Sequence, residues 1–368
     1  MARTFTEIKN GRVILPGGIP GAASVFIDNG KITGVGRGPS PSGTVTIDAR
    51  GLYVSPGFID THIHGDPAEV IAHEIKYGTT AIIPAISCSS PAALRKKVNA
   101  IREFKKDDPL GAMVLGLRLE GPYINKSRAG AQDRRYILPP SESGLRAIIK
   151  QCAPLLKIVT LAPELEGSRE IIGILCKHRI IASAGHSDAN YREAAEGIDA
   201  GITHATHLFN GMRRISPSDA GVAGACLTDK RVTIEIILDM IHVSPARLCL
   251  ALAMKNRDSV ILITDSVRAE ARGRKPAGGV YRLADGAIAG SNLTMIGAVK
   301  NAVRHCGVPL ADAVKFAAAN PARLAGVYGT KGSIEKGKDA DLILFDKDFD
   351  VKMTMVRGKI MYQKRGFI

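Results

Sequence analysis

The chain has 368 residues, of which 45% are hydrophobic and 23% are charged, as is usual for a globular enzyme. No apolar run approaches the ~20 residues that a membrane helix requires, and the first residues lack the apolar stretch of a signal peptide. We therefore expect a cytoplasmic protein with no membrane partner. The net charge of +15 is spread along the chain without a nucleic-acid motif. Attraction of a small phosphorylated metabolite explains it at least as well, and we expect no nucleic-acid partner.

Both ends of the chain contain short apolar runs that alternate with polar residues and are separated by turn signals such as Asn-Gly and Pro-Gly-Gly. The predicted strands are residues 4–9, 12–15, 23–28, 31–36 and 44–48 near the N-terminus, and 341–345, 351–356 and 359–363 near the C-terminus. Neither group can bury much core by itself. We therefore predict one split β-sandwich domain, residues 1–54 together with 333–368.

The middle of the chain, residues 55–332, alternates β-branched runs with longer segments of helical spacing. The strands predicted there are residues 57–64, 79–85, 114–119, 157–162, 180–184, 204–207, 232–237 and 260–264. Eight strands with crossover helices are the number that closes a barrel of about 250 residues. The fold prediction is α/β: a TIM-like (β/α)8 catalytic barrel inserted in the β domain.

The first barrel strand ends in His62-Ile-His64. Side chains alternate along a strand, so both imidazoles lie on the same face, two residues apart. That arrangement suits a chelated metal ion. The alternative is a polar strand end that faces water, but the carboxyl ends of barrel strands are where such folds place their chemistry.

Four further acids and histidines follow other predicted strands: Glu120, His186, His207 and Asp265. Each has a structural explanation by itself. Glu120 fits a solvated loop acid, His207 a hydrogen-bonded core histidine and Asp265 a helix N-cap. Because all strand ends meet at one face of a closed barrel, we expect these side chains to converge there with His62 and His64.

These residues also carry a resemblance to a known family. The motifs Pro56-Gly-Phe-Ile-Asp-Thr-His-Ile-His-Gly65, Leu119-Glu-Gly-Pro-Tyr123, Thr203-His-Ala-Thr-His-Leu-Phe-Asn210 and Thr264-Asp-Ser266 resemble those of the amidohydrolase superfamily. Within it, Glu-Gly-Pro and Thr-His-Leu-Phe-Asn resemble the N-acetylglucosamine-6-phosphate deacetylases. The resemblance implies hydrolysis of an acetamide on a sugar phosphate, and a homodimer or higher homo-oligomer.

The resemblance assigns roles to individual residues. It implies that Glu120, His186 and His207 hold a divalent ion (Zn, Fe, Mn or Co), and that His62 and His64 could add a second ion. Asp265 would carry the proton and His242 would stabilise the oxyanion. The substrate contacts that it implies are Ala131, Gln132, Asn210, Gly211, Arg213, Arg214, His242, Ala289, Gly290 and Ser291.

The chain departs from the family pattern at two positions. Ser218 stands where the family has a phosphate-binding arginine, and Met240 stands where relatives have glycine. Arg213 or Arg214 could supply the missing charge, or both could be solvated loop residues. The alternatives to a 6-phosphate deacetylase are therefore an amidohydrolase for an unphosphorylated or epimeric N-acetyl sugar or another amide, and a non-catalytic scaffold.

Overall fold

A computed structural model of the chain describes residues 5–19, 21–271, 275–284 and 286–367. The chain divides into two compact units: Met1–Asp60, Ile71–Ala81 and Thr294–Ile368 form one, and Thr61–Val70 and Ile82–Leu293 form the other. The domain boundaries proposed from the sequence, after residues 54 and 332, stay a prediction. Thr4, the first residue of the first predicted strand, lies outside the described residues.

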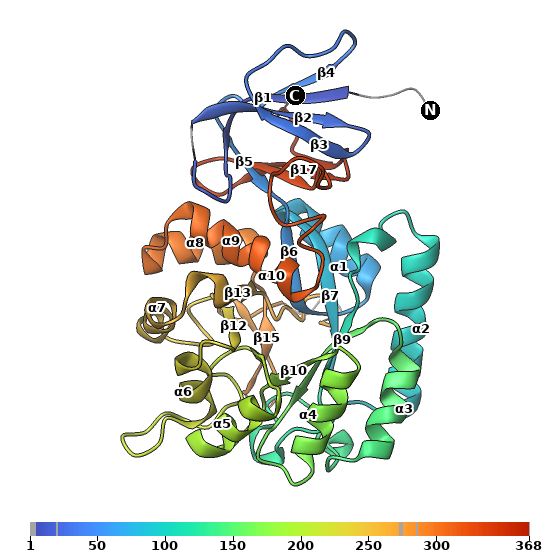
Figure 1. Cartoon of the computed structure of the whole chain (residues 1–368), viewed down its shortest axis with the longest axis vertical. Coiled ribbons are helices and arrows are strands. Elements are labelled where there is room, and N and C mark those ends of the chain that lie inside the picture. Colours follow the sequence, from blue (N-terminus) through green and yellow to red (C-terminus); the bar gives the residue numbers. More distant parts are fainter. Residues whose placement is uncertain (1–4, 20, 272–274, 285, 368) are drawn as a thin grey trace. The chain divides into compact units, whose positions relative to one another are not determined.

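The first unit contains an eight-stranded sheet to which both chain ends contribute (Figure 1). Its strands are β1 (Phe5–Val13), β2 (Ala22–Asp28), β3 (Lys31–Gly36), β4 (Val45–Asp48), β5 (Tyr53–Pro56), β16 (Leu342–Phe345), β17 (Val351–Val356) and β18 (Lys359–Gln363). The order is β18-β17-β16-β5-β1-β2-β3, and β4 also pairs with β1. The C-terminal strands thus supply the pairing and core that the N-terminal strands lack.

The Asn10-Gly11 dipeptide does not separate two strands, as its turn chemistry predicted, but lies inside β1. The register of β1 against β2 shifts between Ile8 and Gly11, and Asn10 has a φ of 59°. Such a bulge bends a strand. Consequently residues before the bulge pair with β4, whereas Arg12 and Val13 pair with β5.

Eight parallel strands follow one another around a barrel in chain order. They are β6 (Phe58–His64), β7 (Thr79–Ile86), β8 (Leu117–Glu120), β9 (Leu156–Leu161), β10 (Ile181–Ala184), β11 (His204–Ala205), β12 (Thr233–Ile237) and β13 (Val260–Ile263). A parallel bridge between Ile63 and Ser266 links the last strand to the first, with Asp265 N–H donating to His62 O over 2.9 Å. The predicted barrel with an added β domain from both termini is confirmed.

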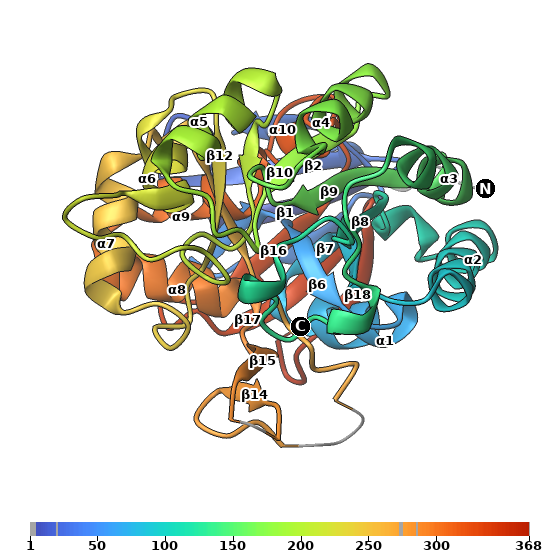
Figure 2. The same ribbon diagram turned by 90° about the horizontal axis from the view of Figure 1, so that it is seen from below.

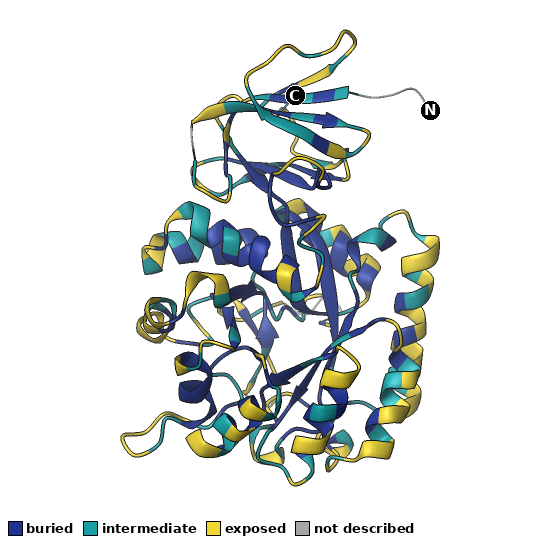
Figure 3. Ribbon diagram, in the orientation of Figure 1, coloured by how far each residue is buried: buried dark blue, intermediate teal, exposed yellow. Residues whose placement is uncertain are grey.

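Helices connect the barrel strands or follow the last of them, and most of these helices carry exposed residues whereas the strands are buried (Figure 3). The helices are α1 (Pro67–Glu74), α2 (Pro91–Asp107), α3 (Glu142–Cys152), α4 (Ser168–Lys177), α5 (Tyr191–Ala200), α6 (Gly221–Thr228), α7 (Pro245–Met254), α8 (Met295–Cys306), α9 (Leu310–Ala317) and α10 (Ala319–Leu324), with short 3-10 turns at Ile75–Tyr77, Gly111–Met113, Lys126–Arg128, Arg134–Tyr136 and Arg257–Ser259. Among the described residues, none of the helices is long and apolar enough to span a bilayer.

A two-stranded antiparallel ribbon follows the last barrel strand and has no counterpart among the sequence predictions. It consists of β14 (Val280–Arg282) and β15 (Ile288–Ser291), and Figure 2 shows it projecting beyond the barrel strands and helices of the second unit. Its inner residues reach the carboxyl ends of the barrel strands, because Ser291 N–H donates to Asp265 O over 3.0 Å.

Candidate metal centre

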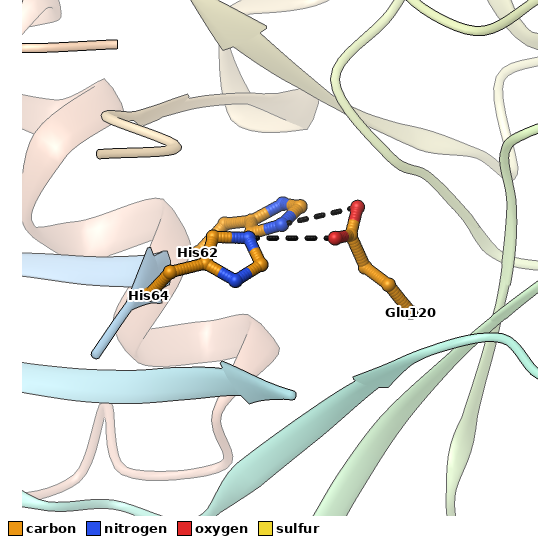
Figure 4. Close-up of side chains that lie close together, drawn as sticks. All are labelled: His62, His64 and Glu120. Carbon is orange, nitrogen blue, oxygen red and sulfur yellow. Dashed lines mark ion pairs between the residues drawn. The ribbon is translucent and has the colours of Figure 1, made fainter. Parts of the chain in front are cut away.

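His62 and His64 project from the end of β6 toward Glu120 at the end of β8 (Figure 4). His62 Nε2 lies 3.3 Å from Oε1 of Glu120, and His64 Nε2 lies 3.4 Å from Oε2. All three side chains are buried. The shared face that strand alternation predicted for the two histidines therefore points at a carboxylate and not at water.

The same carboxylate also meets two histidines that follow β10 and β11. Glu120 Oε1 lies 3.3 Å from His186 Nε2 and 3.0 Å from His207 Nε2, and these two nitrogens are 3.2 Å apart. The potential ligand atoms of each group, His62–His64–Glu120 and Glu120–His186–His207, all lie within 4.8 Å of one another. Glu120 is thus common to two groups that could each hold a cation.

Three of the converging residues have left-handed backbones. The φ angles are 48° at His186, 29° at His207 and 48° at Asp265, and each residue follows a barrel strand directly or closely. Non-glycine residues rarely adopt this conformation, and it concentrates at functional sites. β11 stops at Ala205, two residues before His207, and the imidazole of His207 lies against Glu120.

Asp265 faces the His-x-His pair from the opposite side of the barrel seam. Its Oδ1 lies 3.2 Å from His64 Nε2 and 3.4 Å from His62 Nε2, and its side chain keeps 15% exposure. Burial by itself would raise the pKa of this carboxyl. The positive charge of His62 and the hydrogen bond from His64 outweigh burial and lower the pKa well below 3.8, so Asp265 is ionised at neutral pH.

The donor set fits a divalent cation. Four ligands at ~2.1 Å around zinc would be about 3.4 Å apart, close to the separations between these nitrogens and oxygens. His186 Nδ1 donates to Arg128 O over 2.8 Å, which leaves its Nε2 lone pair directed at the group. Burial lowers the pKa of His64, yet hydrogen bonds to Asp265 and Glu120 raise it to about 10. The carboxylates of Glu120 and Asp265 therefore favour a positive charge among these residues.

Gln132 holds the shared carboxylate in place. Its Nε2 donates to Glu120 Oε2 over 2.8 Å, and its Oε1 accepts from Cys88 N–H over 2.8 Å. The family resemblance implies that Gln132 contacts the substrate. Both polar atoms of its side chain already have protein partners, and Gln132 and Ala131 also line the cavity described next.

A cavity of about 310 Å³ opens above the two groups, entirely within the second unit. Of the predicted residues, it is lined by His64, Glu120, Ala131, Gln132, His186, His207, Asn210, Gly211, His242, Asp265, Ala289 and Gly290. His242 is held by Asp239, whose Oδ2 accepts from Nδ1 over 2.6 Å and whose Oδ1 accepts from the His242 N–H. The cavity thus brings most of the predicted residues together.

Three predicted substrate residues are not among the described residues that line this cavity. Arg213 pairs with Asp219 through Nε at 3.1 Å and donates from Nη1 to Asp188 O. Arg214 is exposed. Ser291 is buried, and its hydroxyl donates to O of Thr264, the residue that precedes Asp265.

Four residues of the site have no assigned role in the sequence predictions: Arg118, His204, Glu235 and Asp239. The sequence could have indicated Arg118 and Glu235. Each is a charged residue within a predicted barrel strand, at a position that faces the barrel interior. Arg118 precedes Glu120 by two residues, so both share the inner face of β8. Only the pairing of distant strands shows that Arg118 meets Glu235.

A parallel barrel whose strand ends present a carboxylate between two histidine pairs defines a metal-dependent hydrolase. A model of the amidohydrolase family matches residues 53–361. The chain belongs to the amidohydrolase family, and the resemblance found in its motifs is confirmed.

Relatives within this family cover almost the whole chain. An N-acetylglucosamine-6-phosphate deacetylase of Lysinibacillus sphaericus is 32% identical over 97% of both chains. An N-acetylgalactosamine-6-phosphate deacetylase of Escherichia coli O157:H7 is 32% identical over 88% of this chain and 90% of that protein. A solved N-acetyl-D-glucosamine-6-phosphate deacetylase of Mycobacterium smegmatis, a mutant in complex with N-acetyl-D-glucosamine-6-phosphate, has a TM-score of 0.88 at 28% identity, covering 98% and 99% of the two chains.

Proposed function

We propose that the protein hydrolyses the acetamide of N-acetylglucosamine 6-phosphate to glucosamine 6-phosphate and acetate, a step of amino sugar catabolism. The observation that carries the proposal is the position of Glu120 between His62–His64 and His186–His207 at the floor of a cavity that Asp265 also lines. The relatives named above supply the substrate class.

Glu120, His186 and His207 would hold one divalent ion, and His62 and His64 with Glu120 would hold a second. Zinc suits imidazole and carboxylate ligands, and iron, manganese or cobalt are the other candidates. The chemistry that a bound cation supplies is the acidification of water and the polarisation of the amide carbonyl.

Asp265 would move the proton. Its carboxylate is ionised at neutral pH and borders the cavity, so it can accept a proton from the attacking water. As the carbon–oxygen bond forms and the carbon–nitrogen bond breaks, the same proton passes to the departing amine, which otherwise leaves poorly.

His242 would stabilise the negative charge that develops on the acetyl oxygen. The Asp239 carboxylate accepts a hydrogen bond from Nδ1–H, so an interaction with the acetyl oxygen would require a second proton on Nε2, and the pair is mostly buried. The ring is thereby held in one orientation at the cavity wall. A fixed polar group at the reacting carbonyl is more effective than one that must reorganise during reaction.

The substrate would lie against Ala131, Asn210, Gly211, Ala289 and Gly290, which line the cavity. Gln132 would contribute by holding Glu120 at the edge of the cavity, and Ser291 through its support of the Asp265 segment. Arg213 and Arg214 remain the proposed phosphate contacts, although Arg213 would first have to leave Asp219 or share its charge with it.

A second candidate is the same chemistry on another N-acetyl sugar, favoured by Ser218 at the position of the family arginine and by the galactosamine relative. Acetate release from N-acetylglucosamine and N-acetylgalactosamine, each with and without 6-phosphate, separates the candidates. We expect a clear preference for N-acetylglucosamine 6-phosphate.

Equal rates with and without phosphate would contradict the role of Arg213 and Arg214. A preparation that binds no divalent ion would instead indicate a scaffold.

We also propose that the enzyme acts in the cytoplasm as a homodimer or a larger homo-oligomer. The conclusion on location follows the class of the proposed reaction, which consumes a phosphorylated metabolite. Light scattering during size-exclusion chromatography tests the assembly, and a monomeric mass at micromolar concentration would contradict it.

A further inference from the structure

A network of buried charges lies inside the barrel beneath the metal ligands, and Glu235 of β12 is at its centre. Its Oε2 lies 3.1 Å from His62 Nδ1, and its Oε1 lies 2.9 Å from His204 Nε2 and accepts a short hydrogen bond from Arg118 Nη1. All four side chains are fully buried. None of them lines the cavity, so this network is separate from the substrate contacts.

The network is braced on several barrel strands. Arg118 Nη1 also donates to Thr61 O over 3.2 Å, and Nη2 donates to the hydroxyl oxygens of Thr160 and Thr206 over 3.3 and 3.0 Å. His204 Nδ1 meets the Thr233 hydroxyl at 2.7 Å. A buried carboxylate with this many partners has one orientation, and the partners fix it.

The position of Glu235 selects one tautomer of His62. An ionised carboxylate only accepts hydrogen bonds, so the 3.1 Å contact requires the proton on Nδ1. The lone pair of a neutral His62 is then on Nε2, which faces Glu120 and Asp265 at 3.3 and 3.4 Å. The other tautomer would direct an N–H at the place where a ligand is needed.

We propose that Glu235 is a positioning residue. It holds His62 in the tautomer whose Nε2 lone pair can bind a cation, and thereby makes His62–His64–Glu120 a binding site for a second ion. Arg118 and His204 compensate its charge and hold it in place. The inference rests on the proposed metal centre, and it does not depend on which sugar is the substrate. Carboxylates behind metal-binding histidines raise metal affinity by about 10- to 100-fold.

The test is stepwise titration of metal-free protein with Zn²⁺, with bound metal counted by mass spectrometry, for wild type and Glu235→Gln. We expect two ions in the wild type. In Glu235→Gln the first ion should bind within about threefold of wild type, whereas the second should weaken by about 10- to 100-fold. A purely structural role of Glu235 would weaken both ions together, so the difference between the two ions is the decisive measurement.

The matched control is Glu74→Gln, the same change at a buried carboxylate that lies 2.8 Å from the Nδ1 of a histidine, His73, outside the two metal groups. It should keep both ions near their wild-type affinities. If Glu235→Gln does not fold, because Arg118 is left as an uncompensated buried charge, the double variant Arg118→Met with Glu235→Gln removes the charge pair together and should show the same selective loss.

Three results would overturn the proposal: a wild type that binds a single ion, a Glu235→Gln variant that binds the second ion as tightly as wild type, and equal weakening of both ions. Failure of the proposed function is distinguishable. It would appear as absent acetate release by a wild type that still binds two ions and loses only the second in Glu235→Gln.

Discussion

Gln132 donates a hydrogen bond from Nε2 to Oε2 of Glu120 over 2.8 Å, and a second bond from the backbone N–H of Cys88 fixes the orientation of its amide. Gln132 is thus tied to the carboxylate that both histidine pairs share. Because an amide in this position restricts the rotation of Glu120, it supports the metal ligand and is not simply a part of the cavity wall.

Gln132→Met should lower metal affinity, because it keeps the length of the side chain but removes both hydrogen bonds. We expect an affinity about 10- to 100-fold weaker, with activity restored by excess metal and an unchanged KM for the sugar phosphate. Metal titration and steady-state kinetics measure the two quantities. A raised KM with unchanged metal affinity would instead support the sugar contact predicted from the sequence.

Asp265→Asn should bind metal but turn over slowly, since a carboxamide cannot shuttle the proton. A loss of about 10²- to 10⁴-fold in kcat is expected. Acetate release at saturating substrate measures it, together with metal content. Asp66→Asn, which changes an exposed aspartate at the start of α1, is the matched control and should retain activity. If Asp265→Asn turned over at nearly the wild-type rate, Asp265 would not be the proton carrier.

Gly211→Ala should displace a metal ligand. Gly211 has a φ of 59°, and a Cβ there would lie 2.9 Å from His186 Nδ1, the atom bonded to Arg128 O. Gly307→Ala is the control, because Gly307 has a φ of 63° with nothing within 4 Å of its Cβ. In both variants the alanine must adopt the left-handed backbone conformation, which costs roughly 1–2 kcal/mol of stability. Only Gly211→Ala should lose metal in a titration; equal metal binding by both would contradict the steric argument.

The free energy of unfolding should fall as the pH rises above 9, partly because of Cys226. Burial raises the pKa of this thiol from 9.0 to about 12. Above pH 9 the thiol of the unfolded chain releases its proton, whereas the folded protein retains it. Proton release then favours the unfolded chain, so the free energy of unfolding falls as the pH rises from 9 toward 12. The contribution is about 1 kcal/mol between pH 8.5 and 10.

Urea unfolding at pH 8.5 and pH 10 measures this difference. Cys226→Ala should show a smaller fall than wild type. Val222→Ala, a buried change on the same helix that removes no titrating group, should lower stability equally at both pH values. An identical pH-dependent fall in Cys226→Ala and wild type would show that the thiol is not protected by burial.

Local patterns were enough to predict the barrel strands and the ligands at their ends. Alternation placed His62 and His64 on one face, and the left-handed residues that end the strands occur at the predicted His186, His207 and Asp265. Turn chemistry was less reliable at Asn10-Gly11, where pairing of β1 with both β4 and β5 converted a predicted turn into a bulge. The strands β14 and β15 have only three and four residues, which is too short for an alternating pattern to predict them.

The amino-acid sequence by itself determined the fold class, the family and the residues that could bind a metal, because these depend on periodicity and on short motifs. Only the tertiary structure decided that Glu120 is shared by two histidine pairs, that Gln132 braces it, and that Arg118 and Glu235 compensate each other under His62. These relationships join residues of different strands, and nothing in the order of residues along one strand specifies which distant side chain will lie opposite.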